Sequence, residues 1–186
     1  MIELMVSIAI IVLVLTVTLT RQSSFNSAVL LRSEAFNIAL AIREIQLGAV
    51  SAESDGSGEF RALQGVYFDI RATDGNPRQY ILFRDRDNDS FYDSNEALGI
   101  QGSIDPRFEI TQMQLVGVAG SQNRLSIVFE RPNFDAIFNQ NNSSVSTAAT
   151  AARIRLGLVG ATTDNCGDDY RDIEITSAGQ ISVVNC

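Results

Sequence analysis

The chain contains no histidine, and every one of its 14 basic residues is an arginine. Without histidine and lysine, it cannot form Ser-His or Cys-His nucleophile pairs, histidine-ligated metal sites or lysine Schiff bases. Its 22 acidic residues leave a net charge of −8, which disfavours a sequence-independent grip on nucleic acid phosphates. We therefore expect a chain that is not an enzyme and does not bind nucleic acid.

Glycine and proline are missing from the first 20 residues, and Glu3 is the only charge there. Twenty helical residues extend about 30 Å, the thickness of the hydrocarbon core of a bilayer. The sequence therefore predicts a transmembrane helix over residues 1–20. A secretory signal peptide is the alternative, but no basic residue precedes the apolar core and no small-residue cleavage site follows it.

A second helical pattern follows the apolar segment and predicts that the helix continues over residues 21–50. Apolar residues recur three and four positions apart, which places them on one face: Leu31, Ala35, Ile38, Ile42, Ile45 and Ala49. The run of small and polar residues over 51–58 predicts the end of this helix. One helix of about 50 residues then needs a partner for its apolar face, which a β-sheet can supply.

Residues 51–186 show the alternation and turn residues of β structure and predict a β-rich globular body. The segments that favour strands are 66–70, 79–83, 108–118, 124–129, 152–158, 171–176 and 180–184. Ser177-Ala-Gly179 predicts a hairpin turn between the last two, and the polar segment 139–150 predicts a loop. We expect an α+β fold in which the long helix packs on one antiparallel sheet of six to eight strands.

Residues 85–96 read DRDNDSFYDSNE and have the ligand spacing of a 12-residue calcium loop. The predicted calcium ligands are Asp85, Asp87, Asp89, the backbone carbonyl of Phe91, Asp93 and Glu96. Ser90 replaces the usual glycine of such loops, and the preceding strand makes this a lone loop on a β scaffold. The alternative is a solvated acidic turn without metal.

Cys166 and Cys186 are the only cysteines. A disulfide between them would hold the C-terminus in place, contribute about 3 kcal/mol and imply an oxidising compartment. Two unrelated reduced thiols are the alternative. A metal site is disfavoured, since two thiols and no histidine make a poor ligand set.

The opening residues Met1-Ile2-Glu3-Leu4 resemble the third to sixth residues of mature type IV pilins and pseudopilins, which begin Phe-Thr-Leu-Ile-Glu. The stretch from Arg171 to Val183 resembles the GspH/FimT branch of pseudopilins and minor pilins. The leader peptide, its final glycine and the first two mature residues are missing here, which suggests a truncated or misassigned start. Pilins often carry a C-terminal disulfide loop, so the resemblance also favours the Cys166–Cys186 pair.

The resemblance implies the pilin fold and a minor pilin or pseudopilin of a type IV pilus or type II secretion-like filament. It assigns Glu3 to assembly, pairing with the N-terminal amine of a neighbouring subunit. Other pilin subunits, a prepilin peptidase that also implies methylation, and an assembly platform are the implied partners. A solvated, idle Glu3 is the alternative, although ionisable residues within an apolar span are usually functional.

The implied location is the inner membrane, with the body outside the cytoplasm, followed by the filament. Arg21, after the apolar segment, would by itself keep the body in the cytoplasm, whereas the cysteines favour the opposite side. A missing basic leader would remove this conflict. The alternative function is a membrane-anchored calcium-binding or adhesive module that does not polymerise.

Overall fold

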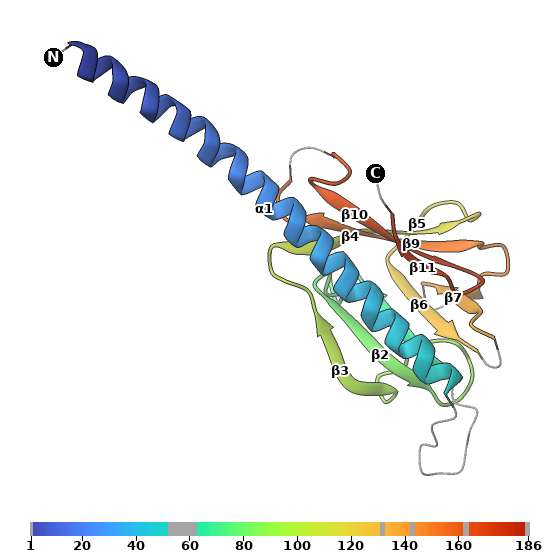
Figure 1. Cartoon of the computed structure of the whole chain (residues 1–186). Helices are drawn as coiled ribbons and strands as arrows, with labels where there is room; N and C mark the ends of the chain where they lie inside the picture. The colour runs from blue at the N-terminus through green and yellow to red at the C-terminus, as the bar shows by residue number, and fades with distance from the viewer. Residues whose placement is uncertain (1, 52–62, 131–132, 142–143, 162–163, 185–186) are drawn as a thin grey trace.

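The computed structural model describes residues 2–51, 63–130, 133–141, 144–161 and 164–184. Side chains of residues 18–25, Ile100 and Ser144 are also outside the description. One helix precedes eleven strands (Figure 1). Their bounds are α1 Ile2–Val50, β1 Leu63–Asp69, β2 Gln79–Asp85, β3 Ala97–Ser103, β4 Phe108–Val116, β5 Ser121–Gln122, β6 Arg124–Phe129, β7 Ala136–Gln140, β8 Ser144–Val145, β9 Ala151–Leu158, β10 Tyr170–Thr176 and β11 Ile181–Val183.

The strands form two antiparallel sheets. The first has six strands in the order β3-β2-β1-β6-β7-β8, and the second has five in the order β11-β10-β9-β4-β5. The predicted hairpin over 171–184 is confirmed, since β10 pairs with β11 and places Ile173 opposite Val183. Strands β3, β5, β7 and β8 were not predicted, and β8 lies inside the segment expected to be a loop.

The C-terminal part of α1 lies across both sheets and contacts β1, β6, β9, β10 and β11. Its six predicted core positions, from Leu31 to Ala49, are all buried, as the helical spacing predicts. They meet alternating residues of the strands, such as Phe68, Leu125 and Ile175, which have no exposed surface. Fully burying an isoleucine or leucine side chain contributes about 1.5–3 kcal/mol, so this contact fixes the helix on the body.

The predicted fold class is wrong in its architecture. The described part of the chain is mostly β, with eleven strands in two sheets, instead of a long helix lying on the face of one sheet. The described side chains of α1 fall into residues 2–17, which project beyond the body, and residues 26–50, which reach it (Figure 1). The predicted strands omitted β3, β5, β7 and β8, and sequence periodicity carries no information about which strands share a sheet.

The predicted transmembrane helix is also corrected. Within the described part of the chain, no helix combines the length and hydropathy needed to cross a membrane. The predicted inner-membrane location was inferred from that span and is therefore corrected as well.

Candidate functional site

The acidic segment 85–96 connects β2 to β3 at one edge of the first sheet. Asp85 is the last residue of β2, and Glu96 immediately precedes β3. Both carboxylates are buried, whereas Asp87 and Asp89 are exposed. Asp93 is exposed as well, so the loop presents two buried acids at its ends and three exposed acids between them.

Three carboxylates of this loop converge. Oxygen atoms of Asp85, Asp87 and Asp89 lie within 4.8 Å of one another, close enough to hold one metal ion. Burial raises the pKa of Asp85 to about 6, and the nearby charge of Glu96 adds to the rise, while two backbone N–H bonds oppose it. A cation would relieve the cost of gathering these charges, because hard dications prefer carboxylate oxygens.

Asp85 also determines the backbone path of the loop. Its Oδ1 accepts the N–H of Asn88 at 2.7 Å, and its Oδ2 accepts the N–H of Ser90 at 2.8 Å. Asn88 and Ser90 have φ values of 61° and 66°, in the left-handed region that normally favours glycine. Ser90 thus adopts the left-handed backbone conformation for which calcium loops normally use glycine at this position.

Glu96 closes the loop from its other end. Its Oε1 accepts the N–H of Arg86 at 2.8 Å, and its Oε2 accepts the N–H of Asp93 at 3.1 Å. The N–H of Phe91 bonds to the Asp89 carboxylate at 2.7 Å. The cluster found among the described residues contains the three aspartates, so Phe91, Asp93 and Glu96 remain predicted ligands.

Residues outside the loop hold it on the sheet, and sequence analysis missed them. The Asn139 side chain, fully buried in β7, donates from Nδ2 to the carbonyl of Ser90 at 3.2 Å. Tyr92 stacks on Tyr67 with ring centroids 4.8 Å apart and meets the edge of Phe83 at 5.5 Å. Tyr92, an aromatic residue inside an acidic run, is the part of this anchoring that the local sequence could have indicated. Asn139 lies 49 residues from Ser90, so the local sequence could not have indicated its contact.

Glu3 lies in the first turn of α1, within the apolar segment 2–17. The large apolar side chains of this segment are exposed to solvent, from 81% for Ile2 to 51% for Val17. Among the described residues of α1, the first core position is Leu31. The assembly role of Glu3 therefore remains a prediction, on a segment that its own chain leaves uncovered.

The predicted disulfide joins Cys166, which the structure describes, to Cys186, which it does not. Cys166 is half-buried in the turn before β10, where the N–H of Gly167 bonds to the carbonyl of Tyr170 at 2.9 Å. Cys166 is disulfide-bonded and is not a free cysteine. Cys186, the other half of the predicted pair, lies outside the described residues, so the Cys166–Cys186 pairing stays a prediction.

Comparison with known proteins gave no match to a family model, to a curated protein or to a solved structure. Two features of the chain itself indicate its function: the exposed apolar segment of α1 and the acidic loop between β2 and β3.

Proposed function

We propose that this protein is a structural subunit of a type IV pilus-like or type II secretion-like filament and assembles through the N-terminal part of α1. The observation that carries the proposal is the exposure of the apolar segment 2–17. Of the exposed large apolar side chains that the structure describes, twelve lie between Ile2 and Val17. A continuous apolar surface of this kind marks an interaction site.

A second copy of the chain is the proposed cover for this surface. The segment is apolar on all sides of the helix, so one partner cannot cover it and several neighbours are needed. Contacts between unlike surfaces of identical subunits form rings when the rotation between subunits closes and open helical polymers when it does not. A projecting apolar helix joined to a polar β body is suited to such a polymer, with helices inside and bodies outside.

Glu3 adds to this assembly the requirement for a positively charged partner. It is the single charge between residues 2 and 17, and packing the segment among other helices would remove its carboxylate from water. A buried charge without a partner is costly, so the assembled state requires a cation opposite Glu3. The resemblance to pilins supports this role, and it also supports a prepilin peptidase and an assembly platform as further partners.

Two apolar-to-charged substitutions test the filament proposal. We expect Ile10→Asp with Leu13→Asp to reduce polymer formed by the full chain by at least about tenfold, since each buried carboxylate is strongly unfavourable. Polymer mass is measured by ultracentrifugal pelleting and its form by electron microscopy. The matched control is Val145→Asp with Val159→Asp, which changes two exposed apolar residues of the body.

The control variant should polymerise like the unmodified chain. Polymerisation that survives the Ile10 and Leu13 substitutions, or an unmodified chain that remains monomeric under all conditions tested, would contradict the proposal. Circular dichroism melting of both variants verifies that the body remains folded, because none of the four positions is buried.

We further propose that the Asp85–Asp87–Asp89 cluster binds calcium. Its three converging carboxylates and the left-handed Ser90 support this, together with the order of acids along the loop. In this proposal, calcium stabilises the connection between β2 and β3 within each subunit. Its binding is a property of the body and does not depend on polymer formation.

Calcium titration followed by thermal unfolding tests this second proposal. Calcium at 100 times its Kd should raise stability by about 2.7 kcal/mol, and magnesium at the same concentration should do less. Asp85→Asn should abolish the calcium effect, while the matched Asp74→Asn, in an exposed turn outside the cluster, should retain it. No calcium-dependent change in the unmodified chain would refute the calcium site.

A further inference from the structure

The part of α1 that packs on the body carries a second, exposed stripe beside the buried one. Its members are exposed and follow one another at helical spacing of three or four: Val29, Arg32, Phe36, Leu40, Arg43 and Leu47. We call these six residues the outer stripe. Four of them are large apolar side chains, and two are arginines. A stripe of this composition is suited to a second helix with a matching apolar face.

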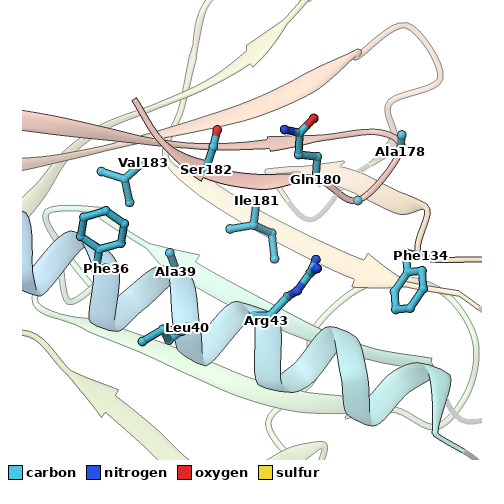
Figure 2. Close-up of a pocket in the computed structure, with 11 residues that line it drawn as sticks. Phe36, Ala39, Leu40, Arg43, Phe134, Ala178, Gln180, Ile181, Ser182 and Val183 are labelled. Carbon is cyan, nitrogen blue, oxygen red and sulfur yellow. The ribbon is translucent and has the colours of Figure 1, made fainter. Parts of the chain in front are cut away.

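A groove continues the outer stripe onto the second sheet. It has a volume of about 490 Å³ and lies between α1 and the β10–β11 hairpin. Figure 2 shows Phe36, Ala39 and Arg43 directed from the helix toward β11, and Ile181 and Val183 directed toward the helix. The surface next to the outer stripe is therefore concave and largely apolar.

A buried glutamine maintains this groove. Gln46 has no exposed surface, and its Nε2 donates to the carbonyl of Gly179 at 2.7 Å and to that of Phe134 at 3.1 Å. Its Oε1 accepts a hydrogen bond from Arg43 at 2.6 Å. Gln46 thus fixes the hairpin turn relative to α1 and orients Arg43 along the edge of the groove.

Both arginines of the outer stripe are available to a carboxylate from outside the chain. Arg32 lies over the Phe36 ring at 5.6 Å, and Arg43 bonds to Gln46. Among the ion pairs within the described residues, neither arginine contacts an acidic group. The apolar segment 2–17 carries the complementary charge, the single carboxylate of Glu3.

We propose that the outer stripe and its groove receive residues 2–17 of a second copy of this chain, with the helices parallel and Glu3 beside Arg32. This inference rests on the proposed filament and names the surface through which its subunits meet. In this register, Ser7, Ile11 and Val14 of one copy lie against Phe36, Leu40 and Arg43 of the other. These residues share one face of α1, since their spacing repeats that of the outer stripe.

The same geometry selects Arg32 over Arg43 as the partner of Glu3. An open polymer requires neighbouring copies that point the same way along the filament. With parallel helices, placing Glu3 beside Arg43 would extend the apolar segment past Val50, where α1 ends. Placing Glu3 beside Arg32 keeps the whole segment against the outer stripe, with a stagger of about 43 Å at 1.5 Å per residue.

Small side chains also suit this register. Ser7 would oppose the bulky Phe36, and its hydroxyl already donates to the carbonyl of Glu3 at 2.8 Å within α1. No unpaired polar group would therefore be introduced into the contact at that position. Ala39, next to Phe36 on the groove side, leaves further space for the incoming helix.

Charge exchange in the full chain tests the pairing. We expect Glu3→Arg alone and Arg32→Glu alone each to lower polymer mass by at least about tenfold, because each places like charges opposite one another. The double variant should return polymer mass to within about threefold of the unmodified chain. The matched control combines Glu3→Arg with Arg43→Glu, the same charge change on the same stripe, and should not restore it.

The possible outcomes separate this inference from the filament proposal. Polymer that is insensitive to the Arg32 exchange overturns the inference and leaves the filament standing. Restoration by Arg43→Glu, with particles of two-chain mass in analytical ultracentrifugation, also overturns it and indicates a closed antiparallel pair. An unmodified chain that forms no polymer overturns both. Thermal unfolding of each variant excludes loss of the fold, since Glu3, Arg32 and Arg43 are exposed.

Discussion

The two described stretches of α1 differ in apolar content and have opposite relations to the rest of the molecule, since the more apolar one is exposed. Residues 2–17 are apolar on every side and exposed, whereas residues 31–49 bury one apolar stripe against two sheets. The difference shows that hydrophobicity by itself does not place a helix in the core. A stripe can be covered by one partner, but a helix that is apolar all round needs several.

The first stretch is therefore expected to act between molecules and the second within one. Substitutions that weaken the fold should concentrate in the second stretch, and substitutions that weaken assembly should concentrate in the first. The following predictions test this division, beginning with the largest expected effect on stability.

Replacing a buried residue of the second stretch should cost far more stability than replacing an exposed residue of the first. Ile42 has no exposed surface, and Ile42→Ala should lower the free energy of unfolding by about 2–5 kcal/mol. Ile10 is 59% exposed, and Ile10→Ala should change it by less than about 0.5 kcal/mol. Denaturant unfolding monitored by circular dichroism measures both, and equal effects would contradict the division.

The hairpin turn beside the second stretch should tolerate no side chain at Gly179. This residue has a φ of 76°, and an added Cβ would lie 1.8 Å from the carbonyl oxygen of Phe134. We expect Gly179→Ala to cost about 2–3 kcal/mol, because backbone strain and displacement of the turn add together. Gly120→Ala is the control, since φ there is 92° but the space is open. A cost no greater than that of the control would show that the turn moves freely.

Gln46 should contribute measurably to the attachment of α1. Gln46→Ala removes hydrogen bonds to the carbonyls of Gly179 and Phe134 and should cost about 1–2 kcal/mol. Ser7→Ala, in the first stretch, removes a bond within α1 only and should be nearly neutral. Chemical denaturation again provides the measurement. A neutral Gln46→Ala would mean that burial of apolar residues alone holds the helix.

The acidic loop should add a small pH dependence that neither stretch of α1 shares. Burial raises the pKa of Asp85 to about 6 from an ordinary 3.8, so the folded chain binds this proton more tightly than the unfolded chain. Stability should therefore rise as pH falls from 7 toward 4, increasing the Tm by about 2–4 °C per kcal/mol gained. The melting temperature is measured without divalent cations.

Asp85→Asn should remove this pH dependence, and a saturating cation should reduce it. Asp105 does not interfere in the same range, because hydrogen bonds from Arg107 lower its pKa to about 2, and its contribution is lost only below pH 4. A Tm that falls between pH 7 and pH 5 would contradict the assignment of a raised pKa to Asp85.

Local sequence patterns predicted those parts of the structure that depend on neighbours in the chain. The buried stripe of α1 follows from helical spacing, and the β10–β11 hairpin follows from alternation around Ser177-Ala-Gly179. The convergence of Asp85, Asp87 and Asp89 is also local, since all three lie within one loop. These predictions succeeded because the interactions involved span few residues.

The sequence alone thus determined a helix with a core-facing stripe, a β-rich body and an acidic loop. Only the tertiary structure divided the strands between two sheets, packed the helix across both, and left one end of it uncovered. It also joined Gln46 to Gly179 across 133 residues, creating a groove beside the outer stripe. Such pairings depend on which surfaces meet when the chain collapses, and periodicity along the chain does not encode that choice.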